Sequence, residues 1–342
     1  MKVYVMWNSE NLLLHFELST RCNAYCPGCP RYINNSRVLN PLLEQTNVSI
    51  DDYMRWVPPH TLRDNVRRVM FCGNYGDPIA NPDIVEIIKY TVRNLRDDAY
   101  IVINTNGGLG SVNQWKEIGI SLRDKPRHTV FFSVDGLEDT NHIYRREVLW
   151  KRIDENIRAY TQTGAYGEWD YLVFQHNKHQ KAKAELQCKE WGLHKIRWKD
   201  PMGFYWNGKH HTRGVYDKQG NLEYKLSTRS NAIDEVNITT NISDPIHSTT
   251  MQPQRKFTCK SLQSWGTELM IHVDGTVYPC CYMGDLVNRY VVDPSRQEIK
   301  DLLDRERLSL NTNSIDDVCG YFSNTLWKEF TPQICLKECG HD

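Results

Sequence analysis

Three cysteines, Cys22, Cys26 and Cys29, lie within the stretch RCNAYCPGCP and have the spacing C-x3-C-x2-C. Cysteine thiolates bind zinc ions and iron–sulfur clusters, so this spacing predicts a metal centre. A structural zinc site needs four ligands, and no neighbouring His or Cys supplies the fourth. An iron–sulfur cluster on three thiolates would leave one iron open for another molecule.

The chain has 11 cysteines in 342 residues, and most of them fall into two separate groups. Cys72 and Cys188 stand alone and are expected to be buried or surface bystanders rather than ligands. The second group lies near the C-terminus and comprises Cys259, Cys280, Cys281, Cys319, Cys335 and Cys339. Two groups of thiols in a reducing compartment favour two metal or cluster sites over a framework of disulfides.

Composition narrows the class of protein. Basic and acidic residues number 42 each, so the net charge gives no sign of a nucleic-acid partner. No apolar run is long enough to span a bilayer, and the N-terminus lacks the pattern of a signal peptide. We therefore expect a cytoplasmic protein with no nucleic-acid and no membrane partner.

Short apolar runs alternate with helical patterns between residues 12 and 198. Runs rich in β-branched and aromatic residues that end in turn residues predict strands. They are LLLHFEL (12–18), VRRVMFCG (66–73), AYIVINTNGG (99–108), HTVFFSVDG (128–136), WDYLVF (169–174) and HKIRW (194–198). Helical spacing between them predicts helices over NPDIVEIIKYTVRNLRDD (81–98) and HIYRREVLWKRIDENIRAYTQTG (142–164).

This strand–helix order predicts an α/β fold with a parallel sheet and right-handed crossovers. About six units fit, which is fewer than the eight of a closed barrel, so we expect a partial (βα)6 barrel over residues 1–198. Residues 199–254 are polar and are expected to be an irregular connector. Residues 255–342 are expected to form a small extension, with a β-hairpin that turns at Asp274-Gly275 and a tail that bears cysteines.

Ligands of such folds bind at the carboxyl ends of the strands. The cysteine loop lies there, directly after the first strand, and in this position its spacing resembles the radical SAM superfamily. The resemblance implies that Cys22, Cys26 and Cys29 are catalytic and hold a [4Fe–4S] cluster. The fourth iron would bind S-adenosylmethionine (SAM), and Tyr25 of the same loop would belong to the cofactor-binding residues.

The turn after the second predicted strand, CGNYGDP, is similar to the Gly-Glu-Pro segment that binds the SAM amino group in this family. Gly76, Asp77 and Pro78 match that segment, with Asp in place of Glu. The chain departs from the family by the residues NY between Gly73 and Gly76. A plain Gly/Pro turn is the alternative.

Later strand ends add candidates for the same pocket. The segments NTNGG and SVDG resemble family segments at the SAM pocket, which implies roles for Asn104, Ser133 and Asp135 in binding the cofactor. The segment HIYRRE resembles the family's His-x3-Arg pattern, which makes Arg146 a candidate for the SAM carboxylate. A solvated helix face is the alternative for Arg145 and Arg146.

The pattern C-x15-G-x4-C with a later C-x3-C resembles the C-terminal extension called SPASM, or its shorter form, twitch. The resemblance implies one auxiliary [4Fe–4S] cluster held by four cysteines, namely Cys259, Cys280, Cys335 and Cys339. Cys319 and Cys281 are alternative ligands, and a zinc knuckle is the alternative site.

The resemblance as a whole implies reductive cleavage of SAM to a 5′-deoxyadenosyl radical that abstracts a hydrogen atom from a substrate. We expect a radical SAM oxidoreductase that modifies a peptide or protein and takes electrons from a donor such as flavodoxin or ferredoxin. The alternatives are a small-molecule dehydrogenase that acts on a sugar or alcohol, and a non-catalytic zinc-binding module.

Overall fold

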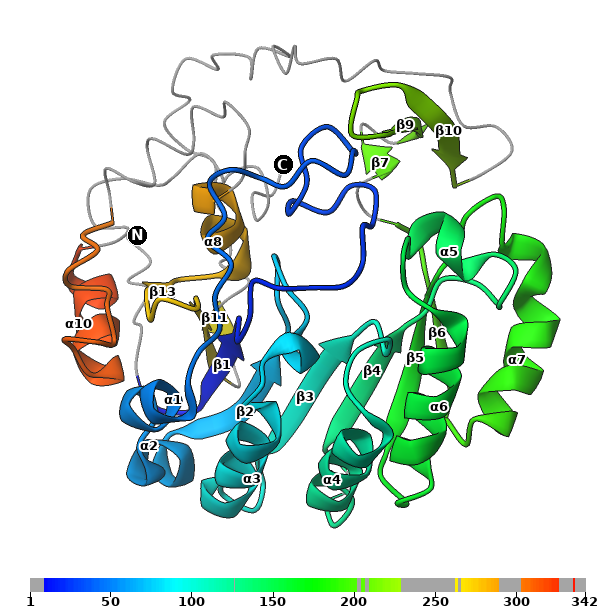
Figure 1. Cartoon of the computed structure of the whole chain (residues 1–342). Helices are drawn as coiled ribbons and strands as arrows, with labels where there is room; N and C mark the ends of the chain where they lie inside the picture. Colours follow the sequence, from blue (N-terminus) through cyan, green and yellow to red (C-terminus); the bar gives the residue numbers. More distant parts are fainter. Residues whose placement is uncertain are drawn as a thin grey trace.

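The computed structural model describes residues 9–125, 127–201, 204–206, 209–228, 262–263, 266–288, 303–325 and 335. Within them, one main sheet has the strand order β11-β12-β1-β2-β3-β4-β5-β6, with β13 paired to β12 (Figure 1). The strands of this sheet are β1 (Leu12–Phe16), β2 (Val66–Phe71), β3 (Tyr100–Thr105), β4 (Thr129–Ser133), β5 (Gly167–Leu172), β6 (Ile196–Lys199), β11 (Leu262–Gln263), β12 (Gly266–Ile271) and β13 (Val277–Tyr278).

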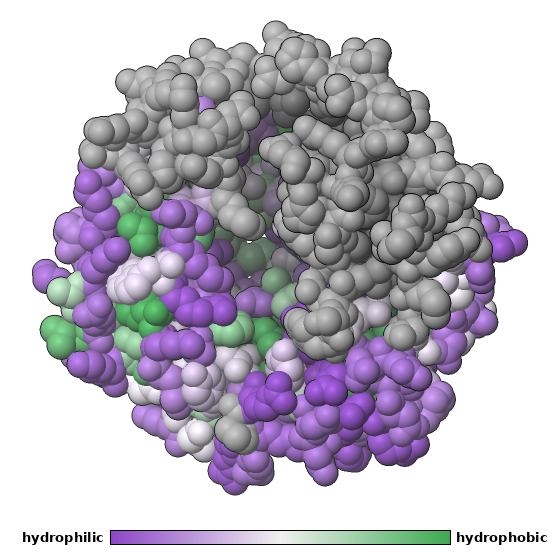
Figure 2. Space-filling model, turned by 180° about the vertical axis from the view of Figure 1, so that it is seen from behind, coloured by the Kyte–Doolittle hydropathy of each residue, from purple (hydrophilic) through white to green (hydrophobic). Residues whose placement is uncertain are grey.

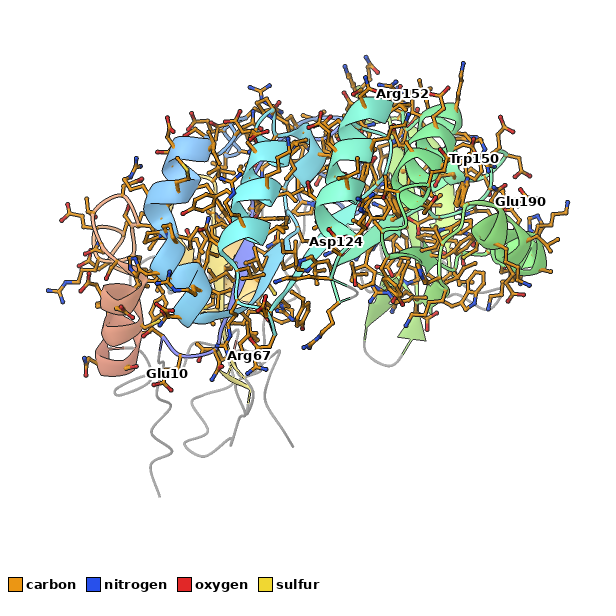
Figure 3. The ribbon with its side chains drawn as sticks, turned by 90° about the horizontal axis from the view of Figure 1, so that it is seen from below. Glu10, Arg67, Asp124, Trp150, Arg152 and Glu190 are labelled. Carbon is orange, nitrogen blue, oxygen red and sulfur yellow. The ribbon has the colours of Figure 1, made fainter. Side chains whose placement is uncertain are left out.

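The run from β1 to β6 is parallel throughout. All six predicted strands are present, and the predicted partial barrel is confirmed. Helices follow the strands and cover one face of the sheet, as Figures 1 and 3 show. They are α1 (Ile50–Trp56), α2 (Pro59–Asp64), α3 (Ile84–Asn94), α4 (Val112–Leu122), α5 (Asn141–Tyr144), α6 (Trp150–Thr161) and α7 (Lys181–Glu190), with short 3-10 turns η1 (Pro78–Ala80) and η2 (Lys178–Gln180).

The hydrophobic core lies between the sheet and these helices. Alternate strand residues such as Phe16 and Phe132 are fully buried there. Phe16 packs on Tyr53 of α1 with ring centroids 5.0 Å apart, and Phe132 packs on Trp115 of α4 at 5.3 Å. Because side chains alternate along a strand, the residues between them point to the other face, away from the helices.

The helix predicted over 142–164 is two helices, α5 and α6, and the chain between them is not helical. Glu147 has a left-handed φ of 69° in this interruption. The side chains of Arg145 and Arg146 turn inward to acidic partners, Asp135 and Glu223. A prediction from apolar periodicity does not detect such ionic contacts, so it joined the two segments.

Part of the predicted irregular connector is regular. Strands β9 (Thr212–Tyr216) and β10 (Leu222–Ser227) form an antiparallel hairpin, and β7 (Tyr205–Trp206) pairs with β8 (Lys209–His210). Val215 and Leu226 of the first hairpin pack with Phe174 and Phe204 in a second, smaller core. The prediction was wrong here because these strands are short and mostly polar.

The C-terminal hairpin turns at Asp274-Gly275 as predicted, and Gly275 has a φ of 80°. Its first strand, β12, also pairs in parallel with β1, which extends the main sheet. The hairpin leads into α8 (Cys281–Asn288), and α10 (Ile315–Thr325) follows later. The indole N–H of Trp56 donates to Oδ1 of Asn311 (3.0 Å), so this part of the chain also packs against α1.

The described surface is mainly hydrophilic, and the hydrophobic residues seen on the face in Figure 2 are scattered. In the ranges that the structure describes, no helix is both long enough and apolar enough to cross a bilayer.

Candidate active site

The cysteine loop leaves the carboxyl end of β1 and lies on the side of the sheet where the parallel strands end (Figure 1). Cys26 is buried, while Cys22 and Cys29 are half-buried. The N–H of Cys29 donates to the carbonyl of Cys26 (3.1 Å), and Gly28 between them has a φ of 83°. This tight turn needs glycine at position 28, since other residues rarely adopt that conformation.

Burial raises the pKa of Cys22 and Cys29 to about 12, and it raises the pKa of Cys26 as well. The thiols also disfavour one another's negative charge. Three thiolates at this place therefore need positive charge, and iron ions of a cluster would supply it.

The arrangement does not suit a single metal ion. Among the described residues, no group of three or more His, Cys, Asp and Glu side chains is placed to hold one ion. In a [4Fe–4S] cluster each thiolate binds a different iron, so the sulfur atoms need not surround one point. The donor set of the loop therefore fits a cluster better than it fits zinc.

The turn that follows β2 lies directly against the cysteine loop. The N–H of Asp77 donates to the carbonyl of Arg21 (2.9 Å). A Cβ on Gly76 would lie 1.8 Å from the carbonyl oxygen of Ser19, so only glycine allows this approach. Pro78 then begins the turn η1. The two predicted segments are thus neighbours in space.

Asp77 is buried, and its carboxylate organises the next strand end. It accepts hydrogen bonds from the Thr105 hydroxyl (2.9 and 3.0 Å), the Asn106 N–H (2.8 Å) and the Ile79 N–H (3.0 Å). Since these donors occupy both oxygens, the carboxylate holds the NTNGG segment in place.

Asn106 was missed by the sequence analysis, which selected Asn104 from the same segment. The Asn106 amide donates to Oδ1 of Asn23 (2.8 Å) and lies 3.5 Å from the sulfur of Cys22. Asn104 is half-buried on β3 and hydrogen-bonds to Cys72. Its position could have indicated this role, because Asn106 directly follows the end of β3 and precedes Gly107 and Gly108.

Asp135, after β4, is fully buried and binds Arg145. Its Oδ2 lies 2.6 Å from Nε of Arg145, and its Oδ1 accepts from the N–H of Leu172 (2.6 Å). Burial raises the pKa of Asp135, and the charge of Arg145 opposes that shift. Nη1 of the same guanidinium lies 3.7 Å from the sulfur of Cys26. Arg145 therefore faces the cysteine loop.

Arg146 is also buried but points elsewhere. Its guanidinium pairs with Glu223 of β10 and lies over the ring of Tyr224, 5.8 Å from the centroid. Neither arginine lies on a solvated helix face. The backbone carbonyl of Arg146 does touch the cysteine loop, since it accepts from the N–H of Tyr25 (3.1 Å).

The ring of Tyr25 stacks on Tyr32 at 4.9 Å, and the Arg37 guanidinium lies 5.8 Å from its centroid. Ser133 ends β4 and is half-buried, opposite Asp170 of β5 in the parallel register. Asp170 binds Arg197 of β6 through two contacts (2.5 and 2.7 Å). The face of the sheet away from the helices is therefore polar near the site.

Of the predicted auxiliary ligands, Cys280 is half-buried at the end of the hairpin and Cys335 is buried. Cys259 and Cys339 lie outside the described residues. Cys281 begins α8, and Cys319 is buried within α10. Burial raises the pKa of Cys319 to about 12.

Comparisons with known proteins gave a match to a family model and to a curated relative. Residues 16–174 match the family model of the Radical SAM superfamily. The 7,8-dihydro-6-hydroxymethylpterin dimethyltransferase of Methanocaldococcus jannaschii is 25% identical over 142 residues, or 40% of this chain. The match spans a quarter of that relative's length.

Solved structures share the fold across most of the chain. Streptococcus suis SuiB bound to its precursor peptide SuiA has a TM-score of 0.52 and 16% identity, over 97% of this chain and 70% of that one. Native anSMEcpe with bound AdoMet also has a TM-score of 0.52, with 13% identity over 90% and 80% of the two chains. The cysteine loop, the parallel sheet and the family match over residues 16–174 together identify a radical SAM domain in this chain.

Proposed function

We propose that this chain cleaves SAM reductively and modifies a peptide or protein substrate. When bound, SAM and a reduced [4Fe–4S] cluster supply a 5′-deoxyadenosyl radical, which takes a hydrogen atom from an unactivated C–H bond. The protein places the substrate carbon near that radical and excludes competing reactions.

The contact between the cysteine loop and the turn at Gly76–Pro78 carries this proposal. The loop would hold the cluster through Cys22, Cys26 and Cys29, and the turn would hold the SAM amino group. The hydrogen bond from Asp77 to Arg21 and the missing side chain of Gly76 bring the two segments together. Asp135 keeps the positive charge of Arg145 beside Cys26.

A peptide substrate is supported by two observations. SuiB, which shares the fold over most of the chain, binds a precursor peptide in the structure compared above. The face of the sheet away from the helices also carries hydrogen-bonding groups, among them Asn104, Ser133, Asp170 and Arg197. Such groups suit a peptide backbone and polar side chains.

A small polar molecule is the second candidate. The name of the Methanocaldococcus relative indicates a pterin substrate, and the same polar face would suit a compound of that kind. The two candidates differ in what they predict for the hairpin β9–β10, which contacts the chain that follows the cysteine loop. Asn35 donates to the carbonyl of Gly214 (3.3 Å) there. If the substrate is a peptide, we expect an open groove along this hairpin. If the substrate is a small molecule, we expect the hairpin to close a pocket.

We further propose one auxiliary [4Fe–4S] cluster in a SPASM/twitch-type extension, held by Cys259, Cys280, Cys335 and Cys339. It would exchange an electron with the substrate or relay electrons. The reductant would be a protein such as flavodoxin or ferredoxin, and the place of action the cytoplasm.

Anaerobic reconstitution with iron and sulfide, followed by SAM and dithionite, tests the radical chemistry. We expect about eight irons per chain, as two [4Fe–4S] clusters require, and formation of 5′-deoxyadenosine. Cys26→Ala should abolish 5′-deoxyadenosine, whereas Cys188→Ala, on α7, should preserve it. Stoichiometric zinc without iron, or intact SAM, would overturn the proposal.

Substrate class is tested by isotope transfer. Candidate peptides and candidate small molecules deuterated at their C–H positions are incubated with the active enzyme, and deuterium in 5′-deoxyadenosine is measured by mass spectrometry. Transfer from a peptide supports the first candidate. Transfer from small molecules alone supports the second.

A further inference from the structure

Asn74 and Tyr75, the two residues by which the turn departs from the family's pattern, both reach helix α8. The amide of Asn74 donates to the carbonyl of Cys281 (3.4 Å), and the hydroxyl of Tyr75 donates to the carbonyl of Asp285. The partners are more than 200 positions apart in the sequence. The inserted pair therefore joins the turn to the C-terminal part of the chain.

The backbone of Tyr75 is held on the opposite side by the barrel. Its N–H donates to Oε1 of Glu17 (2.5 Å), and its carbonyl accepts from Nη1 of Arg31 (2.7 Å). The same nitrogen of Arg31 donates to the carbonyl of Thr20, next to the cysteine loop. Tyr75 is fully buried. It is hydrogen-bonded to Glu17, which follows β1, to Arg31, which follows the cysteine loop, and to Asp285 of α8.

Helix α8 lies close against the sheet, because Gly284 has no side chain. A Cβ at this position would lie 2.9 Å from the sulfur of Met270 and 3.0 Å from Nε2 of His272, both on or beside β12. His272 meets the Tyr75 ring edge-on, with centroids 6.4 Å apart. A movement of α8 relative to β12 would therefore disturb Tyr75.

The residue after Tyr75 is Gly76, which begins the segment proposed to bind the SAM amino group. Gly73 and Gly76 close the base of the turn, since a Cβ on Gly73 would lie 2.5 Å from the carbonyl oxygen of Gly76. The position of Gly76 thus depends on the tip of the turn, and α8 holds that tip.

We propose that the contact of Asn74 and Tyr75 with α8 lets the C-terminal hairpin position the Gly76–Pro78 turn for SAM. This inference rests on the proposed function. Tyr75 is a positioning residue in this arrangement: it acts through the backbone of the turn. The C-terminal segment Gly266–Asn288 is then part of the SAM site.

The test compares Tyr75→Phe with Tyr160→Phe in the reconstituted enzyme. Both changes remove a buried hydroxyl that donates to a backbone carbonyl, because the Tyr160 hydroxyl binds the carbonyl of Tyr166 (2.7 Å) far from the turn. Loss of one such hydrogen bond changes an equilibrium about three- to tenfold. We expect the Kd for SAM, measured by calorimetry, to rise by about that factor in Tyr75→Phe alone.

The cleavage rate at saturating SAM should stay near that of the unmodified enzyme, because Tyr75 does not touch the reacting atoms. Asn74→Ala should show a smaller rise in the Kd for SAM. It also provides a second test should Tyr75→Phe fail to fold. Equal SAM affinity in the unmodified enzyme, Tyr75→Phe and Asn74→Ala would overturn the inference and leave the proposed function standing. Failure of the unmodified enzyme to bind or cleave SAM would overturn the proposed function itself.

Hydrogen exchange gives a readout that does not depend on activity. In Tyr75→Phe, amide exchange should increase in the turn 73–78 and in α8 together, because the two segments share the lost contact. In Tyr160→Phe, neither segment should change. An increase confined to the turn, with α8 unchanged, would contradict the link between them.

Discussion

Nη1 of Arg145 lies 3.7 Å from the sulfur of Cys26, while Nε of the same side chain lies 2.6 Å from Oδ2 of Asp135. A buried carboxylate thus directs a guanidinium towards a thiol that we propose to bind the cluster. Positive charge and hydrogen bonds at cysteine sulfurs raise the reduction potential of an iron–sulfur cluster, because reduction adds negative charge.

Arg145→Gln should therefore lower the midpoint potential of the proposed SAM-binding cluster, by an amount on the order of tens of millivolts. Arg146→Gln is the matched control, because Arg146 is the adjacent buried arginine and pairs with Glu223 instead. A redox titration followed by EPR spectroscopy, without SAM, measures both. Equal potentials in the two variants would show that the contact with Cys26 has no electrostatic effect.

Asp77→Ala should destabilise the fold at the carboxyl end of β3. The change leaves the Thr105 hydroxyl and the Asn106 N–H without their buried acceptor. Unsatisfied buried donors cost about 1–3 kcal/mol each, so the free energy of unfolding should fall by roughly 2–6 kcal/mol. Anaerobic urea unfolding measures this.

Asp217→Ala serves as the control for Asp77→Ala, since Asp217 also accepts backbone N–H groups, from Gln219 and Asn221, but at an exposed turn. Water can replace the carboxylate there, and we expect a loss below about 1 kcal/mol. Similar losses in the two variants would contradict the organising role of Asp77.

The strand ends of the barrel could be predicted from the sequence because each strand is a short run of β-branched and aromatic residues closed by a turn. The cysteine loop, CGNYGDP, NTNGG and SVDG meet at one edge of the sheet, as parallel topology requires. The side-chain assignments were less predictable. Which of two adjacent arginines faces Cys26 depends on φ and ψ at residues 145–147, and periodicity carries no information on that.

The long-range pairing of β12 with β1 could not be predicted either. The sequence around Gly275 shows a hairpin, and the strand could pair with any free sheet edge. Only the three-dimensional contacts, such as Arg68 with Glu268 across β1 (2.9 Å), show that it extends the barrel sheet. The contact of Asn74 with α8 follows from that pairing.

Cys319→Ala should keep the full iron content of the reconstituted enzyme. Cys319 is 2% exposed within α10, where it packs as an apolar side chain. Cys280→Ala and Cys335→Ala should each lose about four irons per chain if these residues hold the auxiliary cluster. Iron and sulfide analysis with Mössbauer spectroscopy measures the difference, and a loss of four irons in Cys319→Ala would assign the fourth ligand to α10.

Glu17 should make the stability of the protein depend on pH. Burial raises the pKa of its carboxyl from 4.5 to about 8. Between these values the unfolded chain has released the proton and the folded chain has kept it, so stability falls as pH rises through this window. Below pH 4.5 both states are protonated, and above pH 8 both are ionised, so the slope disappears on either side.

Glu17→Gln removes this proton but keeps an oxygen acceptor for the N–H of Tyr75. The variant should therefore gain stability relative to the unmodified protein by about 1.4 kcal/mol per pH unit between roughly pH 5 and 8. Anaerobic urea unfolding of both proteins at several pH values in that range measures the difference. Parallel curves would mean that the Glu17 carboxyl is already ionised in the folded protein throughout this pH range.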